Sequence, residues 1–234
     1  MSRYPNIGDH GLIGDLQTAA LVSTDGTLDW FCCPRFDSPS VFASLLDADG
    51  GGFFKIRPDR DDYVSKQLYL PDTAILVTRF MTPDGVGEVH DFMPIAEGGA
   101  TDRHRLVRNI HVVRGTMRFA MEIQPRFDYG RAAHKLELTN SGGVFQSDGL
   151  ELTVHGIAPE GTSIQDAITV ERAGDGVRWS RTLRVGIVHC TFIHAHALPL
   201  NGTAVPNRGK HVQPVQRQRA TSPRMSDTKD FTVI

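Results

Sequence analysis

Residues 74–92 read AILVTRFMTPDGVGEVHDF, and their pattern is the clearest indication of the fold class. Apolar and β-branched residues predominate in residues 74–81 and recur at Val86, Val89 and Phe92, as is typical of β-strands. Between them stands Pro83-Asp84-Gly85, a sequence that favours a tight turn. Two short apolar runs joined by such a turn predict an antiparallel hairpin.

Asp-Gly pairs recur along the chain and predict further hairpins, because tight hairpin turns need a residue with positive φ and glycine supplies it. The five pairs are Asp25-Gly26, Asp49-Gly50, Asp84-Gly85, Asp148-Gly149 and Asp175-Gly176. The other predicted strands are residues 18–23, 27–33, 106–113, 117–123, 144–146, 150–155, 168–171 and 177–183. One short helix is expected over residues 40–46. Regular turns without helical periodicity predict an all-β fold, a large antiparallel β-sandwich of the supersandwich type.

The composition is that of a globular protein that binds no nucleic acid. The 234 residues are 40% hydrophobic and carry a net charge of -2, so there is no broad basic surface to attract a polyanion. No run approaches the roughly 18 apolar residues that span a bilayer, and the first residues carry no secretory signal. We therefore expect no membrane contact and a cytoplasmic location. Cys32 and Cys33 are adjacent and Cys190 is distant, a spacing that favours buried reduced thiols over disulfides.

The character of the chain changes near Arg184. Residues 185–234 contain no Glu, Tyr or Trp, and their few charged residues are mostly Lys and Arg. From Asn201 on, the apolar content is too low to offset the entropy of ordering, which predicts disorder. Two interpretations stay open: a flexible basic tail, or a reading frame that shifted near Arg184, which we favour. We expect a β domain over residues 1–184 and an atypical tail, disordered or frameshifted, over residues 185–234.

The first forty residues contain the densest cluster of polar and aromatic side chains. Its members are Asp9, His10, Asp15, Asp29, Trp30, Arg35, Phe36 and Asp37. An indole ring covers the apolar face of a pyranose while charged groups bind its hydroxyls, so this cluster is suited to a sugar. The alternative, which composition alone favours, places Trp30 in a strand core and pairs Arg35 with Asp37. Residues 37–39 then cap the short helix.

The sequence predicts neither a cofactor nor a resident metal. His189, Cys190, His194 and His196 resemble metal ligands, since His-x-His on a strand puts both imidazoles on one face. A third well-spaced ligand is missing, so an accidental site is the favoured interpretation. The chain also lacks the GxGxxG, GxxxxGK[ST], HExxH and GxSxG motifs of nucleotide-binding proteins, zinc proteases and α/β-hydrolases.

Longer motifs at the amino terminus resemble a known enzyme family. They are GLIGD (residues 11–15), SxDGxxDW (residues 23–30) and PRFDSPSVFAxLLD (residues 34–47). Together they are similar to the opening of bacterial family 15 glycoside hydrolases, the group of trehalases and glucoamylases. YLPDTAIL (residues 69–76) and VHDFMP (residues 89–94) resemble the same domain, so the resemblance extends to about residue 183.

The resemblance implies a large amino-terminal β-sandwich, a linker and an (α/α)6 barrel that holds two catalytic glutamates. Nothing after Arg184 reads as a series of amphipathic helices. The resemblance therefore implies the non-catalytic part of a carbohydrate-metabolising enzyme, truncated before its barrel, with no catalytic residue in this chain.

The resemblance also gives the first cluster a role. If the sandwich packs on the barrel, we expect a domain interface or a wall of the active-site mouth at Asp29, Trp30, Arg35, Phe36, Asp37 and Ser38. The expected partners are the missing barrel and α-glucoside sugars, and an uncovered apolar face predicts self-association. The alternative is a free-standing carbohydrate-binding sandwich with Trp30 or Tyr129 as its platform. A hydrolase that uses the sandwich's own aspartates is least favoured.

Overall fold

The two hairpins with the clearest sequence patterns form as predicted. The computed structural model describes residues 4–95, 103–139, 142–157, 171–185 and 188–197, all within the unit Met1–Asn201. β2 (Ala19–Ser23) pairs with β3 (Thr27–Cys32), and β7 (Leu76–Thr82) pairs with β8 (Gly85–Phe92). The local pattern and turn chemistry therefore specify both hairpins.

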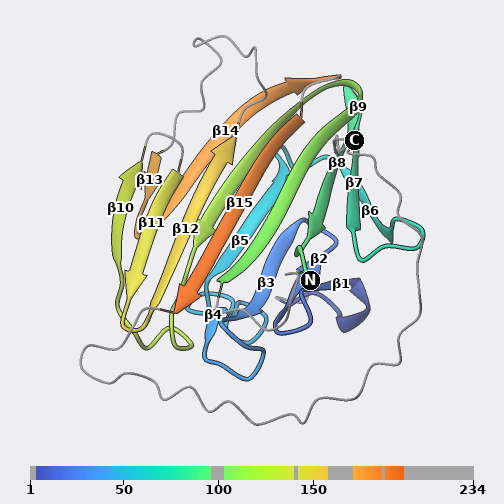
Figure 1. Cartoon of the computed structure of the whole chain (residues 1–234). Coiled ribbons are helices and arrows are strands. Elements are labelled where there is room, and N and C mark those ends of the chain that lie inside the picture. The colour runs from blue at the N-terminus through green and yellow to red at the C-terminus, as the bar shows by residue number, and fades with distance from the viewer. Residues whose placement is uncertain (1–3, 96–102, 140–141, 158–170, 186–187, 198–234) are drawn as a thin grey trace, which may run out of the picture. The chain divides into compact units, whose positions relative to one another are not determined.

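One long strand, β9 (Arg103–Gln124), connects the two layers of the fold. The sequence predicted two strands here, but they are continuous through Gly115, whose φ of +70° lets the strand bend. The first half of β9 pairs with β8 and β15 (Val188–Ala197). Its second half pairs with β5 (Phe53–Pro58) and β14 (Gly176–Arg184). The long green strand of Figure 1 thus belongs to both layers.

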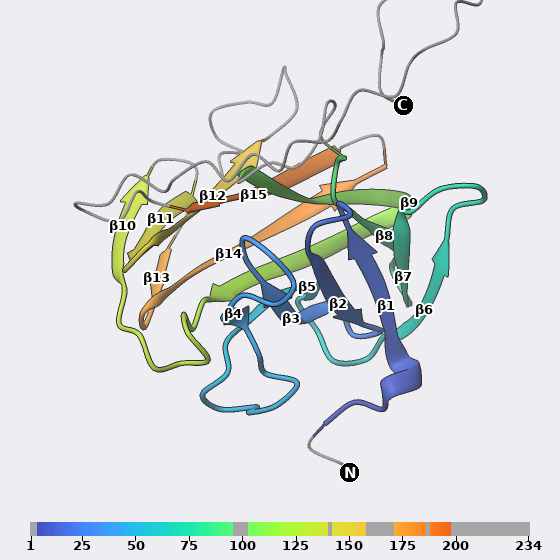
Figure 2. The same ribbon diagram turned by 60° about the horizontal axis from the view of Figure 1, so that its bottom comes forward.

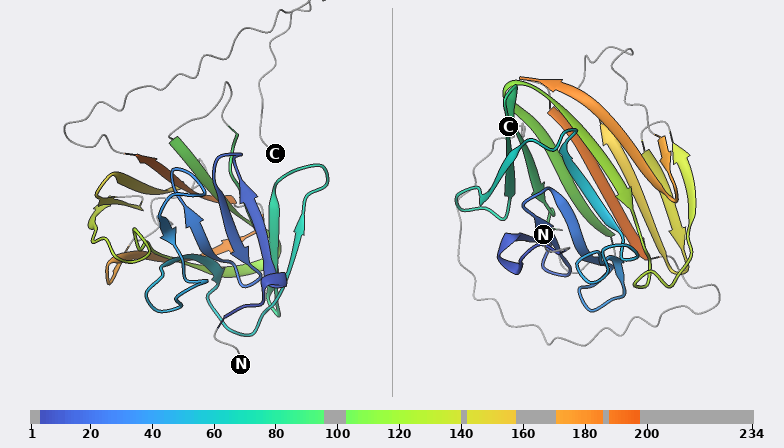
Figure 3. Two further views of the ribbon diagram at one scale, coloured as in Figure 1. Left: turned by 90° about the horizontal axis from the view of Figure 1, so that it is seen from below. Right: turned by 180° about the vertical axis from the view of Figure 1, so that it is seen from behind.

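Each layer is an antiparallel sheet. The first layer runs β1 (His10–Gly14), β2, β3, β5, second half of β9, β14 and β13 (Glu171–Ala173), with β4 (Ser40–Phe42) beside β3. The second layer runs β6 (Val64–Tyr69), β7, β8, first half of β9, β15, β12 (Leu150–Ile157), β11 (Gly142–Ser147) and β10 (Lys135–Thr139). Figure 2 shows β1, β2 and β3 in front of β12 and β15, and the back view of Figure 3 shows β9 and β14 side by side.

The core lies between the layers. Phe80 of β7 meets Phe119 of β9 edge to face with 6.2 Å between ring centroids, and both are fully buried. Val177 and Trp179 of β14 are also buried, as is Leu152 of β12 in the other layer. Each such side chain contributes about 1.5–3 kcal/mol through the area it removes from water. This apolar interior confirms the predicted all-β sandwich.

The predicted helix over residues 40–46 is wrong. Ser40–Phe42 forms β4, and Phe42 pairs with Phe31 of β3. Val41 and Phe42 are both fully buried, so packing of an extended segment outweighs local helix propensity. Residues 37–39 therefore cap no helix. Among the described residues, the one helical element is the three-residue 3-10 turn η1 (Ile7–Asp9).

The prediction that the glycine of each Asp-Gly pair has positive φ is correct at only some turns. Gly26 and Gly149 have positive φ, whereas Gly50, Gly85 and Gly176 do not. At the β7–β8 turn, the Pro83 ring fixes φ of that residue at about −65°. The turn therefore uses Pro83 and Asp84, whereas Gly85 already belongs to β8. Turn type thus depends on the neighbours of each Asp-Gly pair.

The sheet continues past the change in composition at Arg184. β15 lies between β9 and β12 and pairs with both, and its Thr191, Ile193 and Ala195 are buried on one face. Alternating burial of this kind is what a sheet-forming strand requires. The disorder predicted from Asn201 on lies outside the described residues. No helix in the described part of the chain is long and apolar enough to cross a membrane.

Candidate functional site

The loop between β3 and β4 presents three predicted site residues to solvent. Arg35 donates from Nε and Nη2 to the two carboxylate oxygens of Asp37, at 2.9 and 2.8 Å, which confirms the predicted pair. The backbone N–H of Arg35 donates to Ser38 Oγ at 3.1 Å. Between the charged residues, Phe36 is 71% exposed. An exposed ion pair contributes only about 0–1 kcal/mol, so its main effect here is to order the loop.

A rigid turn lies beside this loop. The N–H of Phe36 donates to the carbonyl of Gln17, and Leu16 is 85% exposed with a φ of +73°. A branched residue in the left-handed region is strained, and it persists only when its surroundings hold it. Asp15 does so. Its Oδ1 accepts the N–H groups of Gln17 and Thr18, and its Oδ2 lies 2.6 Å from Nδ1 of the buried His104.

These two segments make one surface, which we call the Leu16–Phe36 surface and define as Leu16, Arg35, Phe36 and Asp37. It combines two exposed apolar side chains with one cation and one anion. The buried Asp15 holds the backbone of the turn at Leu16, and the Arg35–Asp37 pair holds the loop around Phe36. Such a preorganised, partly apolar surface is suited to contact another protein surface.

Trp30 and Tyr129, the two predicted aromatic platforms, contact each other. Their ring centroids are 6.5 Å apart and their planes are inclined at 47°. The Arg131 guanidinium lies 5.6 Å from the centroid of the Tyr129 ring. Because the rings are tilted, they do not form one flat platform on which a pyranose would stack.

Asp29 is buried, unlike the other residues of the predicted interface. Leu21 pairs with Trp30 and Val22 with Leu28, so Asp29 is the extra residue of a β-bulge in β3. Its Oδ2 lies 2.8 Å from His10 Nε2, and His10 Nδ1 lies 3.0 Å from the Asn6 carbonyl oxygen. Both ring nitrogens therefore face an acceptor, an arrangement that the doubly protonated imidazolium satisfies fully.

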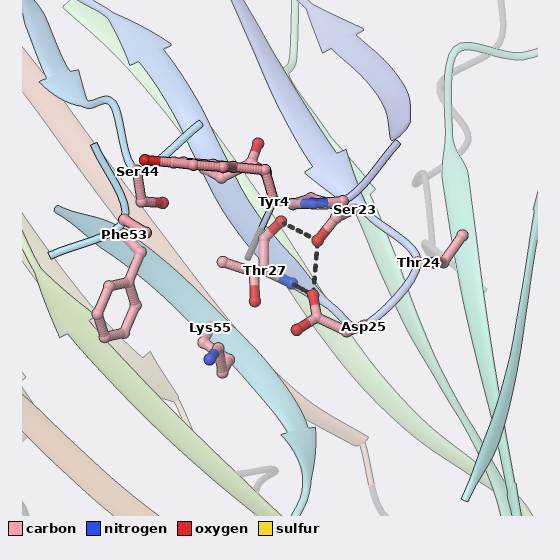
Figure 4. Close-up of a pocket in the computed structure, with 11 residues that line it drawn as sticks. Tyr4, Ser23, Thr24, Asp25, Thr27, Ser44, Phe53 and Lys55 are labelled. Atoms are coloured by element: carbon pink, nitrogen blue, oxygen red, sulfur yellow. Dashed lines mark hydrogen bonds between the residues drawn. The ribbon is translucent and has the colours of Figure 1, made fainter. Parts of the chain in front are cut away.

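Asp29 also lines a pocket of about 380 Å³ over β3 and β5, which we call the β3–β5 pocket. Its lining residues are Tyr4, Pro5, Ser23, Thr24, Asp25, Thr27, Asp29, Ser44, Ala48, Phe53 and Lys55. Figure 4 shows the hydrogen bonds at its floor, where Asp25 Oδ1 accepts from Ser23 Oγ at 2.5 Å and from the Thr27 N–H at 3.0 Å. Ordered polar groups of this kind in a concave site favour ligand binding.

Burial and hydrogen bonding shift three pKa values here. Burial raises the pKa of Asp29, and the hydrogen bond and charge of His10 offset only part of that rise. Burial by itself lowers the pKa of His10, but the contact with Asp29 and the carbonyl of Asn6 outweigh it, so the net pKa is raised. Burial also acts to raise the pKa of Asp25, yet its bonds to Ser23 and Thr27 prevail and the net pKa is lowered.

The raised pKa of His10 makes stability depend on pH. The folded protein binds the His10 proton more tightly than the unfolded chain, whose ordinary pKa is 6.5. The stabilisation is therefore fully present below pH 6.5 and is lost as pH rises through the folded pKa. We expect the urea midpoint of the wild type to fall from about pH 6 to about pH 8 more steeply than that of His10→Asn. Parallel profiles for the two proteins would contradict this assignment.

The histidines proposed as accidental metal ligands lie on β15. The side chains of His189, Cys190 and His196 are outside the described part of the structure, and the His194 ring lies 5.9 Å from that of His155. The described residues contain no group of three His, Cys, Asp or Glu side chains arranged to hold a metal ion.

Sequence reasoning missed a buried ion pair and a buried histidine–aspartate contact. Asp91 and Arg108 are opposite each other on β8 and β9 and are both fully buried, and Asp15 pairs with His104 across the layers. A charged residue within each of two predicted strands, Asp91 in 86–92 and Arg108 in 106–113, was a signal for the first pair. The second pair gave none, because its members are far apart in the sequence.

Comparisons with known proteins assign this domain to a family. A family model described as trehalase-like, N-terminal, matches residues 2–172. The chain is 35% identical to the trehalase of Thermoplasma volcanium over 62% of this chain and 24% of the relative. It is 33% identical to trehalase 2 of Sulfolobus acidocaldarius over 76% of this chain and 30% of the relative.

A further relative is trehalase 1 of the same Sulfolobus species, 41% identical over 51% of this chain and 19% of the relative. In each case the match spans less than a third of the relative's length. The family model covers well over half of this chain. The chain therefore belongs to the trehalase-like N-terminal domain family.

Proposed function

We propose that this chain is the non-catalytic amino-terminal β domain of a family 15 glycoside hydrolase of the trehalase or glucoamylase type. In this proposal the chain is truncated before the (α/α)6 barrel that carries catalysis. The observation that carries it is the match to trehalases over only 19–30% of their length. We also propose a cytoplasmic location, with which the buried free thiols of Cys32 and Cys33 agree.

The chemistry of hydrolysis supports a non-catalytic role. Glycoside hydrolysis needs two carboxyl groups on either side of the scissile bond, one of which protonates the leaving oxygen. The buried acids of the described residues are already engaged by basic partners. Asp15 is held by His104, Asp29 by His10 and Asp91 by Arg108, while Glu88 contacts both Arg79 and His90.

The Leu16–Phe36 surface supports a docking role for this domain. The sequence placed the interface at Asp29, Trp30, Arg35, Phe36, Asp37 and Ser38, and Arg35, Phe36 and Asp37 are the exposed members of that set. We propose that the barrel covers them together with Leu16. Without the barrel, the exposed Leu16 and Phe36 favour self-association, which Phe36→Ser should reduce.

The experiment that tests the proposal starts at the gene. The DNA beyond the Arg184 codon is resequenced and every frame is translated, and a frame with barrel-like helices and two candidate glutamates is restored. The restored protein should hydrolyse trehalose or maltose, whereas the 234-residue chain should hydrolyse neither. Hydrolysis by the chain alone that disappears with one Asp→Asn change would overturn the proposal.

In the restored enzyme, Arg35→Ala should lower the catalytic efficiency or the thermal midpoint, because it breaks the pair that orders the docking loop. The control is Arg118→Ala, which breaks an exposed pair with Asp59 of similar length, 2.7 Å, together with a hydrogen bond to Ser180, elsewhere on the surface. We expect the control to change stability by less than about 1 kcal/mol. Unchanged kinetics and unchanged stability in Arg35→Ala would refute the interface.

A further inference from the structure

Residues 4–9, which we call the strap, lie at the edge of the β3–β5 pocket. Tyr4 and Pro5 line the pocket, and the Tyr4 side chain extends across it toward Ser44 (Figure 4). The remainder of the strap includes η1, which buries none of its residues, and Ile7 is 91% exposed. A segment with so little apolar burial opens at a low free-energy cost, so its polar contacts decide whether it is closed.

Hydrogen bonds connect the strap to its surroundings. The Tyr4 hydroxyl donates to a backbone carbonyl of the β4–β5 loop at 3.5 Å, which is long for such a bond. The Thr24 N–H donates to the Asp9 carbonyl at 2.9 Å, and His10 Nδ1 lies 3.0 Å from the Asn6 carbonyl oxygen. The His10 side chain is 4% exposed, so it is a buried, titratable anchor of the strap.

His10 keeps both of its contacts only when its ring carries two protons. Its Nε2 lies 2.8 Å from Asp29 Oδ2, so a carboxylate faces one ring nitrogen and the Asn6 carbonyl faces the other. A neutral imidazole has one N–H, and its other nitrogen carries a lone pair. Among the described residues, His10 is the side chain that bonds Asp29, and a buried carboxylate without a partner is costly. The remaining proton therefore stays at Nε2, and the Nδ1 lone pair then faces the Asn6 carbonyl.

The charged groups around His10 favour the doubly protonated ring. Asp29 of β3 contacts it directly, and Asp25 in the β2–β3 turn acts on Asp29. Asp9 precedes it in the strap, the residue opposite it on β2 is an uncharged serine, and β7 meets the next residue of β1 with the apolar Leu76. Burial by itself lowers the pKa of His10, but the Asp29 and carbonyl contacts prevail and raise it above its ordinary value of 6.5.

We propose that residues 4–9 are a pH-sensitive strap of the β3–β5 pocket, closed while the His10 ring carries two protons and released when Nδ1 loses its proton. The closed form binds this proton more tightly than the open form. Closure is therefore complete below pH 6.5 and is lost as the pH rises through the raised pKa of His10. The strap needs neither a barrel nor a catalytic residue, so this inference goes beyond the proposed function and is independent of it.

The test is hydrogen exchange of backbone amides, measured by NMR on the full 234-residue chain. The protection of each amide relative to the unfolded chain is followed from about pH 5.5 to about pH 8.5, the range in which histidine titrates. The Asp9 N–H donates to the Asn6 carbonyl and the Thr24 N–H to the Asp9 carbonyl, so both amides report closure of the strap. We expect their protection to fall at least about tenfold as the pH rises, the effect of losing a hydrogen bond to a charged group.

The reference amide is that of Ile56, which donates to the Gly26 carbonyl and belongs to the buried core. Exchange there requires opening of the sheet itself. At the high end of the pH range, the Thr24 amide should be at least about a hundredfold less protected than the Ile56 amide, because the strap opens while the sheet stays folded.

His10→Gln separates the two contacts of the ring. The glutamine amide nitrogen takes roughly the place of Nε2 and can still donate to Asp29, but no donor replaces Nδ1 and no charge is gained. The protection of the strap amides should therefore be low at every pH. Asp29→Asn removes the charge that favours the second proton, so the transition should move to lower pH. The matched control is His134→Gln, because His134 Nε2 also lies near a backbone oxygen, the Asp175 carbonyl at 2.9 Å, and it should leave the wild-type profile unchanged.

Three results would overturn the proposal. One is protection of the strap amides that does not depend on pH. Another is a transition that persists in His10→Gln, which would assign it to a different group, such as the α-amino group with its ordinary pKa of about 7.7–8.0. The third is equal protection of the Thr24 and Ile56 amides at high pH, which would mean that the strap opens only when the whole domain unfolds. If His10→Gln does not fold, a transition that stays in place in Asp29→Asn would overturn the proposal instead.

Discussion

Replacing Asp91 with alanine is expected to lower the free energy of unfolding by about 3–5 kcal/mol, because it leaves a charged arginine buried without its counter-ion. Arg108 donates from Nε and Nη2 to the two oxygens of Asp91 at 2.8 and 3.1 Å. It also donates to the carbonyls of Phe54 and Gly26 at 2.7 and 2.9 Å. Both side chains of the pair are 0% exposed, so no water replaces the lost carboxylate.

The matched control for this experiment is Asp37→Ala, which removes an arginine partner with similar geometry at the surface. The Arg35 and Asp37 side chains are 68% and 54% exposed, so we expect a loss of at most about 1 kcal/mol. The measurement is the midpoint of urea denaturation, which reports stability when the dependence of the unfolding free energy on urea concentration (the m value) is the same in each variant. A double change, Asp91→Leu with Arg108→Met, should recover part of the loss, since it removes both charges. Equal losses in Asp91→Ala and Asp37→Ala would contradict the role assigned to burial.

The sequence predicted most strands of the fold because their signals are local. The hairpins β2–β3 and β7–β8 follow from apolar runs and the turns between them, and these depend on a few neighbouring residues. The bend that makes β9 one strand was not predicted. It depends on pairing of each half with a different set of strands, which the local pattern does not contain.

Residues 40–46 show where local patterns fail. Their composition is compatible with a helix, but Phe42 packs 6.3 Å from Phe31 and 6.5 Å from Phe54, ring centroid to centroid. That aromatic contact exists only when the segment is extended along β3. Tertiary packing of this kind decides the structure of short segments with weak propensity.

The candidate site was predicted in part. The Arg35–Asp37 pair followed from proximity in the sequence. Asp29 was grouped with them, but a one-residue bulge directs it into the β3–β5 pocket instead. Asp15 and His104, which fix the turn under Leu16, are 89 residues apart, and only the fold brings them together.

Replacing Gly26 with alanine is expected to lower the free energy of unfolding by about 2–4 kcal/mol. Gly26 has a φ of +83°, where a Cβ alone costs about 1–2 kcal/mol. A Cβ here would also lie 2.1 Å from the Ile56 carbonyl oxygen, so the β2–β3 turn must move away from β5. That movement weakens the bond from the Ile56 N–H to the Gly26 carbonyl, 3.1 Å long, and adds about 1 kcal/mol.

The matched control is Gly174→Ala, because Gly174 also has positive φ, +64°, yet a Cβ there meets nothing within 4 Å. It should therefore show only the backbone cost of about 1–2 kcal/mol. Gly26 and Asp91 both bind Arg108, so their variants should not be additive. A double-mutant cycle should give a coupling of at least about 0.5 kcal/mol. Additive losses would mean that the turn and the buried ion pair stabilise the fold independently, and that Arg108 does not link the first hairpin to β8 and β9.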